Sequence, residues 1–152
     1  MARAPFQVLV YPYRRTAEAE FEFALFRRAD GGWWQGIAGG GEDGETPLDA
    51  ARREADEEAG LPPDLPVVGL STVQSVPVTE FRDSHLWGEE VYVIPQYSFG
   101  ILAQEAEIAL SREHTEVRWM SYDEARRLLQ YDGDRTALWE LRQRLRGHGP
   151  RG

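Results

Sequence analysis

The stretch GGGEDGETPLDAARREADEEAGL, residues 39–61, joins a glycine-rich turn to a helix whose two ends are both marked by the sequence. Thr46 can cap the helix, and Pro47 takes the first helical position, where the N–H group has no intrahelical partner. Asp49 lies where a capping box needs its second acceptor. Gly60 favours the left-handed conformation that ends many helices. We therefore predict a helix that begins near Pro47 and stops at Gly60.

Three glutamates of this helix share one face. Glu54, Glu57 and Glu58 have the spacing i, i+3 and i+4, which places their carboxylates within an arc of roughly 100°. Small and apolar residues lie on a neighbouring arc: Leu48, Ala51, Ala55 and Ala59. The helix can therefore pack on a sheet with one stripe while its acidic stripe faces a cleft.

Clustered carboxylates repel one another, so they ionise easily only when a cation lies among them. Oxygen ligands of this kind suit Mg²⁺, with Mn²⁺ as a substitute. An acidic stripe is also common on the solvent-exposed face of an ordinary surface helix. The helix by itself leaves both interpretations open.

The spacing of the whole stretch resembles the Nudix box, the signature of the Nudix hydrolases. The residues that carry the resemblance are Gly39, Glu45, Arg53, Glu54, Glu57, Glu58, Gly60 and Leu61. Ala55 departs from the pattern, because the family has a bulky aliphatic residue there, and we expect this change to affect packing rather than chemistry. The resemblance implies an α/β/α sandwich with a mixed sheet, in which the box forms a loop, a helix and a loop.

The resemblance also implies roles for the box residues. Glu54, Glu57 and Glu58 would hold divalent metal ions, and Glu54 is our first choice as the base that acts on water. Arg53 and Glu45 would hold and orient these glutamates. An ordinary helix salt bridge is the alternative for Arg53, which is also spaced i, i+4 from Glu57.

Other site residues follow from the flanking segments. By resemblance, the backbone carbonyl of Ala38 would ligate metal, and Glu113 would supply a carboxylate from outside the box, with Glu116 as the next candidate and a plain surface acid as the alternative. Gly39 and Gly40 would let the backbone of a loop approach a metal ion or a phosphate closely.

Aromatic residues near this loop are candidates for stacking on a heterocycle. Neighbouring residues of a strand point to opposite sides, so at most one of Trp33 and Trp34 can face a pocket. We assign Trp34 to the substrate and the other ring to packing. His85 and Trp87 belong to a polar loop that could cover the cleft, and His114 is interpreted as a loop or packing histidine.

Composition narrows the class of protein. The net charge of −9 argues against binding to a nucleic acid polymer, which needs a basic surface. An acidic site that acts on a polyphosphate needs divalent cations to bridge protein and substrate. The absence of cysteine excludes disulfides and thiolate metal sites. With no apolar run long enough for a signal peptide or a membrane span, we expect a cytoplasmic protein without a membrane partner.

The pattern along the chain predicts one α+β domain over residues 1–152, with an ordered core of about 5–146 and a disordered tail HGPRG. Besides the box helix we predict strands over 6–13, 20–27, 33–37, 67–78, 90–103 and 115–120, and helices over 122–130 and 135–146. Residues 79–89 are predicted to form a loop. The sequence assigns no oligomeric state.

The function that this resemblance implies is metal-dependent hydrolysis of a pyrophosphate bond in a nucleoside- or pterin-triphosphate-like substrate, with a monophosphate and pyrophosphate as products. Segments from WWQG to SREHTEVRWMSYDEA resemble the dihydroneopterin triphosphate and dATP diphosphatase branch, although Ala38-Gly39-Gly40 replaces its usual Thr-Gly-Ser run. ADP-ribose and dinucleoside polyphosphates remain alternative substrates. A noncatalytic ligand-binding module and a plain cation-binding protein remain alternative classes.

Overall fold

The computed structural model describes residues 2–18, 20–147 and 149. Most of the tail for which we expected disorder lies outside these residues. The elements are β1 (Arg3–Arg15), β2 (Phe21–Arg28), β3 (Trp34–Gln35), β4 (Ile37–Glu42), α1 (Pro47–Ala59), β5 (Val67–Pro77), the 3₁₀ helices η1 (Val78–Glu80) and η2 (Arg82–Trp87), β6 (Val93–Leu102), β7 (His114–Met120), α2 (Tyr122–Leu128) and α3 (Asp132–Arg146). None of the described helices is long and apolar enough to span a membrane.

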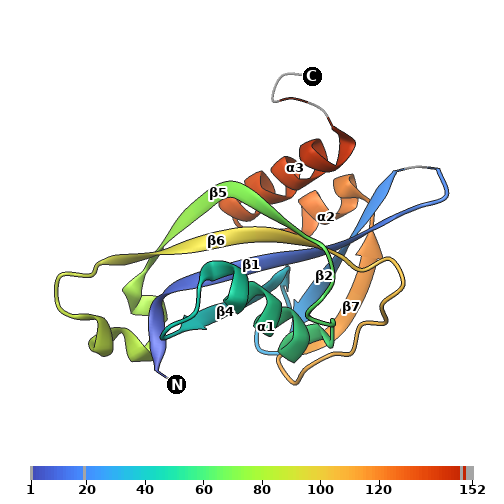
Figure 1. The fold of residues 1–152 in the computed structure, drawn as a ribbon. Helices are drawn as coiled ribbons and strands as arrows, with labels where there is room; N and C mark the ends of the chain where they lie inside the picture. Colours follow the sequence, from blue (N-terminus) through green and yellow to red (C-terminus); the bar gives the residue numbers. More distant parts are fainter. Residues whose placement is uncertain (1, 19, 148, 150–152) are drawn as a thin grey trace.

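The strands form one mixed sheet with the order β3-β2-β1-β6-β5, in which β4 also pairs with β1 and β7 with β2. The β1–β6 pair is parallel, and the other pairs are antiparallel. Strand β1 therefore lies at the centre of the molecule, next to the strand that leads into the box helix (Figure 1). The predicted α+β class and mixed sheet are confirmed.

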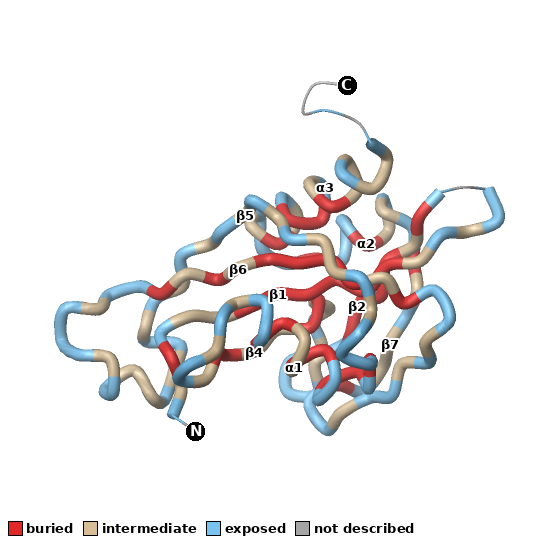
Figure 2. The backbone as a smooth tube through the Cα atoms, viewed as in Figure 1, coloured by how far each residue is buried: buried red, intermediate tan, exposed pale blue. Residues whose placement is uncertain are grey.

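Side chains of β1 alternate between the two faces of the sheet and so belong to two separate hydrophobic clusters. Val8 and Val10 belong to the cluster that includes the alanines of α1, whereas Leu9 and Tyr11 belong to the cluster that includes α2 and α3. Because successive strand residues point to opposite faces, one strand supplies both cores. Helix α1 covers one face of the sheet and α2 with α3 cover the other, and buried backbone runs through the middle layer (Figure 2).

Helix α1 has the predicted ends. The Asp49 N–H donates to Thr46 Oγ1, and Thr46 N–H donates to Asp49 Oδ2, which completes the capping box. Gly60 has φ 67° and ends the helix in the left-handed conformation. The packing expected of Leu48 is wrong, because this side chain is 41% exposed, and the fully buried Leu61 packs in the core instead.

The predicted glycine-rich turn is also wrong in its first half. Gly39 and Gly40 lie in β4, where they pair with Val8 and Gln7 of β1. A β-carbon on Gly39 would overlap the Glu54 carboxyl group, and one on Gly40 would overlap the Arg3 guanidinium. These glycines are therefore needed to make room for side chains packed on the two faces of a strand, not to bend the backbone.

Several other boundaries differ from the predictions. The strand predicted over 33–37 is divided into β3 and β4, the one predicted over 90–103 begins only at Val93, and residues 79–89 contain η1 and η2 rather than an open loop. Helix α2 ends at Leu128, and α3 begins at Asp132, three residues before its predicted start. Helix α3 starts without a side-chain cap, although Asp132 and Asp134 place two acids in its first turn.

Candidate active site

Arg53 is the centre of the acidic cluster. Its Nε and Nη2 donate to the two oxygens of Glu45 at 2.8 and 3.0 Å, and its Nη1 donates to Glu54 at 3.0 Å and to Glu57 at 3.1 Å. Nη2 also donates to the backbone carbonyl of Gly40 at 2.8 Å. One planar guanidinium therefore ties β4 to the carboxylates of α1, which a single ammonium group could not do.

Glu54 is buried against β4, with 8% of its surface exposed. Burial raises the pKa of its carboxyl group to about 7, and the neighbouring Glu57 and Glu58 add to the rise, while Arg53 opposes it. A carboxyl group with a pKa near neutrality can both accept and release a proton under ordinary conditions. This property fits a general base.

Glu58 is equally buried but is held from a different part of the chain. The Ser111 hydroxyl donates to Glu58 Oε2 at 2.6 Å, and His114 Nδ1 lies 3.6 Å from the same oxygen. Glu57 differs from both, since its side chain is 55% exposed. Glu54 and Glu58 are therefore buried and held by partners, whereas Glu57, which accepts a hydrogen bond from Arg53, is the most exposed of the three box glutamates.

Glu113 lies close to this group, in the turn just before β7. Its backbone N–H donates to Ser111 Oγ at 3.3 Å, and its carboxylate lies 4.0 Å from Arg28 Nη1. Its side chain is 54% exposed. Glu116, the next candidate, forms an ion pair with Arg118 along β7.

The donors present fit a hard divalent cation. Carboxylates of Glu54, Glu57, Glu58 and Glu113 would supply oxygen ligands, which Mg²⁺ and Mn²⁺ prefer. Within residues 2–18, 20–147 and 149, however, no three acidic or histidine side chains already form a metal-binding group. Arg53 and Ser111 occupy several of the oxygens instead. The metal-binding roles, including that of the Ala38 carbonyl, stay predictions.

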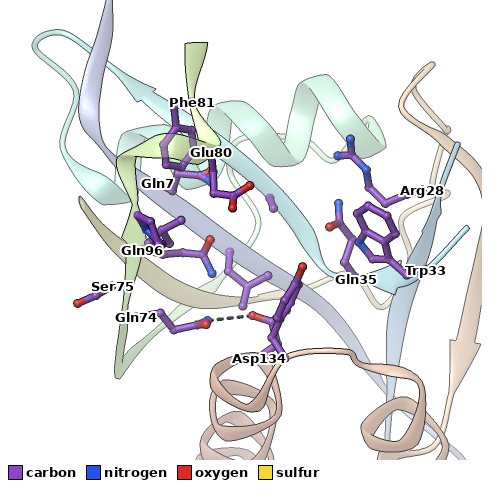
Figure 3. A pocket seen from close by; sticks show the side chains of 15 residues that line it. Gln7, Arg28, Trp33, Gln35, Gln74, Ser75, Glu80, Phe81, Gln96 and Asp134 are labelled. Carbon is purple, nitrogen blue, oxygen red and sulfur yellow. Dashed lines mark hydrogen bonds between the residues drawn. The ribbon is translucent and has the colours of Figure 1, made fainter. Parts of the chain in front are cut away.

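A cavity of about 430 Å³ opens on the face of the sheet that carries α3. Figure 3 shows Trp33, Gln35 and Arg28 on one side, and Gln74 and Asp134 near the start of α3 on another. The lining includes four glutamines and three aromatic residues: Gln7, Gln35, Gln74, Gln96, Trp33, Phe81 and Tyr131. These side chains come from β1, β3, β5, β6 and the segments beside them, so no contiguous motif could have revealed them.

Trp33 and Trp34 lie in different environments from those predicted. Trp33 lines the cavity, whereas Trp34 packs against the core beside α2 and α3, and its ring lies 5.1 Å from the Arg118 guanidinium. Neither His85 nor Trp87 lines the cavity. The Trp87 indole donates to the Arg3 carbonyl at 2.8 Å, which fastens η2 to β1.

Two charged residues of the cavity wall carried no signal in the sequence. Arg28 is the one basic side chain among the described lining residues; a hydrogen bond to Asp30 raises its pKa, and Glu113 and Glu58 raise it further. Asp134 is buried, which raises the pKa of its carboxyl group, and it accepts a hydrogen bond from Gln74 at 2.9 Å. The cavity therefore has a basic side near Glu113 and an acidic side near α3.

His114 is buried between the cavity and α1. Burial and the nearby Arg28 lower the pKa of its ring, so the imidazole is neutral at pH 7. Its Nε2 lies 3.4 Å from Gln35 Nε2. The side chain thus contacts a residue of the cavity wall as well as Glu58.

Comparison with known proteins identifies the family. The NUDIX domain model matches residues 6–141. Over 127 residues the chain is 31% identical to the asymmetrical bis(5'-nucleosyl)-tetraphosphatase of Sus scrofa, covering 82% of this chain and 80% of that protein. It is 30% identical to an octanoyltransferase of Myxococcus xanthus, but the match spans only 32% of that protein's length.

Solved structures agree with this assignment. A NUDIX hydrolase of Listeria monocytogenes is 40% identical and superimposes with a TM-score of 0.85 over 95% of this chain and 96% of that one. The dihydroneopterin triphosphate pyrophosphohydrolase of E. coli is 23% identical, with a TM-score of 0.71 over 91% and 94% of the two chains, a likeness that shows the fold alone. The sequence resemblance and the fold therefore point to the same family.

Proposed function

The chain belongs to the Nudix hydrolase family and is a pyrophosphohydrolase, and on that premise we propose that it cleaves a nucleoside- or pterin-triphosphate-like substrate into a monophosphate and pyrophosphate. One observation carries this choice. The cavity is lined by amide groups and aromatic rings, and Arg28, the one basic side chain among the described lining residues, lies on the side nearest Glu113 and Glu58.

The amide-rich part of the cavity suits a planar heterocycle. A glutamine amide offers both a donor and an acceptor, which matches the mixed edges of a purine or a pterin. Trp33, Phe81 and Tyr131 provide rings against which such a group can pack. A volume of about 430 Å³ is within the usual range for a small-molecule site.

The phosphates belong on the other side. Glu80 and Asp134 also line the cavity, so a polyphosphate placed among them would be repelled. Arg28 can instead pair with a phosphate and direct the chain of phosphates toward Glu58 and Glu113. This orientation places the heterocycle in the cavity and the anhydride bonds beside the box carboxylates.

Glu54, Glu57, Glu58 and Glu113, with the Ala38 carbonyl, would hold Mg²⁺ or Mn²⁺. When bound, the ion neutralises phosphate charge and lowers the pKa of attacking water. Water attacks phosphorus, the bond to the bridging oxygen breaks, and the proton of the water passes to Glu54. Arg53 and Glu45 keep Glu54 oriented for this transfer.

A dinucleoside tetraphosphate is the second candidate, because the Sus scrofa relative is named for this substrate. The chemistry would be the same, but the products would be a mononucleotide and a nucleoside triphosphate rather than a monophosphate and pyrophosphate. Identification of the products therefore separates the two substrates.

The test is to incubate the purified protein with Mg²⁺ and a panel of nucleoside and pterin triphosphates, ADP-ribose and dinucleoside polyphosphates in ¹⁸O-labelled water. Products and label position are read by mass spectrometry. We expect turnover of at least one triphosphate, with release of pyrophosphate. A protein that turns over no member of the panel would refute the proposal.

The same assay is applied to Glu57→Gln, which removes one proposed metal ligand. Glu116→Gln is the control, because Glu116 is a partly exposed glutamate on β7 that pairs with Arg118. We expect the first change to abolish Mg²⁺-dependent turnover and the second to leave it within about threefold. Circular dichroism would check that both variants are folded. Equal activity of the two variants would remove Glu57 from the metal site.

A further inference from the structure

A buried histidine connects the two halves of this site. The His114 side chain has no exposed surface, and its ring packs on Phe26 with 5.3 Å between the ring centres. Nε2 lies 3.4 Å from the amide nitrogen of Gln35, which lines the cavity, and Nδ1 lies 3.6 Å from Glu58 Oε2. One rigid ring therefore spans the distance between the cavity wall and a box carboxylate.

The carboxylate decides where the ring proton lies. Among the described residues, His114 Nδ1 has no hydrogen-bond partner, and the carboxylate oxygen that lies near it is Glu58 Oε2, at 3.6 Å. A lone pair on Nδ1 would be repelled by this oxygen, whereas an N–H group is attracted. The neutral ring is therefore in the form that carries its proton on Nδ1.

This choice fixes the orientation of Gln35. With the proton on Nδ1, Nε2 of His114 can only accept, so Gln35 must donate to it through its amide nitrogen. The Oε1 atom of Gln35 is then left to face the cavity as an acceptor. A substrate group that contacts Oε1 of Gln35 must therefore be a donor.

Glu58 is held at one oxygen. Ser111 Oγ donates to Oε2 at 2.6 Å, and His114 Nδ1 lies 3.6 Å from the same atom. Among the described residues, Oε1 has no hydrogen-bond partner. Oε1 is therefore the atom left available for a divalent cation.

We propose that His114 is a positioning residue, which aims Glu58 Oε1 at the metal ion and keeps Gln35 Oε1 turned toward the substrate. This inference rests on the proposed function of the box and of the cavity. A histidine that only fills space beside Phe26 is the alternative, and it predicts no difference between substitutions of similar size.

Two substitutions of His114 test the contacts of its two ring nitrogens separately. The amide nitrogen of asparagine lies near the position of histidine Nδ1, and that of glutamine lies near Nε2. We expect His114→Asn to keep the contact with Glu58 and lose the one with Gln35, which raises KM about tenfold with a smaller change in kcat. We expect His114→Gln to lower kcat about tenfold or more with a smaller change in KM.

Binding of Mn²⁺ without substrate gives a readout that needs no turnover. Titration followed by electron paramagnetic resonance should show about tenfold weaker Mn²⁺ binding for His114→Gln and a smaller change for His114→Asn. Ser111→Ala tests the same oxygen of Glu58 from the other side and should also weaken Mn²⁺ binding. Gln35→Met tests the cavity side without altering the buried ring and should raise KM more than it lowers kcat.

The outcomes distinguish the two proposals. If His114→Asn and His114→Gln change KM, kcat and Mn²⁺ affinity alike, or if Gln35→Met leaves KM unchanged, His114 is a packing residue and the inference is refuted. If a histidine variant does not fold, Mn²⁺ binding by Ser111→Ala and the KM of Gln35→Met decide between the positioning role and the packing role of His114. If the unaltered protein binds Mn²⁺ but turns over no substrate of the panel, the proposed function fails, while the Mn²⁺ titrations still test the coupling to Glu58.

Discussion

The carboxyl group of Glu54 rests directly on the α-carbon of Gly39, where a β-carbon would overlap it. This contact brings α1 close to β4 and places an acid whose pKa is raised to about 7 against the sheet. Removal from water at this contact is the main cause of that raised pKa. Gly39 is thus part of the environment of Glu54.

Gly39→Ala should displace the Glu54 carboxyl group while leaving the fold intact, because the overlapping atoms form the end of a flexible side chain. A shift of about 1 Å in a catalytic group can lower activity about 100-fold, and we expect a loss of that order. Turnover and thermal unfolding would be measured together. Gly69→Ala is the matched control, since a β-carbon there meets no atom within 4 Å; similar turnover in both variants would contradict the prediction.

Arg53→Lys should lower activity or metal affinity by about 10- to 100-fold, because one ammonium group cannot hold Glu45, Glu54 and Glu57 together. Steady-state kinetics at several Mg²⁺ concentrations would check this. Arg126→Lys, an exposed site on α2, should have no measurable effect. Full activity in Arg53→Lys would show that charge alone is sufficient at this position.

Glu54 should make the metal-free protein less stable as pH rises from about 4.5 to about 7. Its pKa is about 7 in the folded state against 4.5 as the ordinary value, so the folded state binds more protons in this window and loses stability as they are released. The free energy of unfolding should fall by on the order of 3 kcal/mol from this group. Denaturation at pH 5 and pH 7 would measure it.

Glu54→Gln is the control for this pH dependence, because an amide does not titrate and the slope from this residue should vanish. Mg²⁺ should act in the opposite direction, since Glu54 must lose its proton to bind the ion. The ion should therefore stabilise the protein more at pH 8 than at pH 5. An equal pH dependence in Glu54→Gln and the unaltered protein would show that other groups cause it.

The two tryptophans should differ when each is changed to alanine. Trp33→Ala removes a ring from the cavity wall and should raise KM with little loss of stability. Trp34→Ala removes a ring from the core beside α2 and α3 and should lower the free energy of unfolding by about 1–3 kcal/mol. Kinetics and chemical denaturation of both variants would test this. The reverse result would indicate that Trp34, and not Trp33, contacts the substrate.

Helix α1 shows what could be predicted from local sequence. Thr46, Pro47 and Gly60 fix its ends through interactions within a few residues, so the same contacts form wherever the helix packs. The predicted order of strands and helices is also close to the observed one. Apolar residues that alternate in the sequence become the buried faces of the strands, so the pattern indicates where strands lie. Family membership followed from the box spacing and is confirmed by the match over residues 6–141.

The glycines of β4 and the lining of the cavity could not be predicted in this way. A run of glycines is compatible with a turn or with a strand that accepts large side chains, and the overlap with Glu54 and Arg3 exists only after packing. Gln35, Gln74 and Gln96 come from three strands with no common spacing. Nothing near these glutamines in the sequence marks them as site residues, because only the folded sheet brings them together.

The box can be identified from the sequence alone: the helix, its spacing of Glu54, Glu57 and Glu58, and hence the class of reaction. The folded chain was needed to show that Trp33 rather than Trp34 lines the cavity and that His114 lies between Gln35 and Glu58. The difference comes from the range of the interactions. Helix caps and i, i+4 spacing act between near neighbours in the chain, whereas a cavity and a buried hydrogen-bond network exist only where distant strands meet.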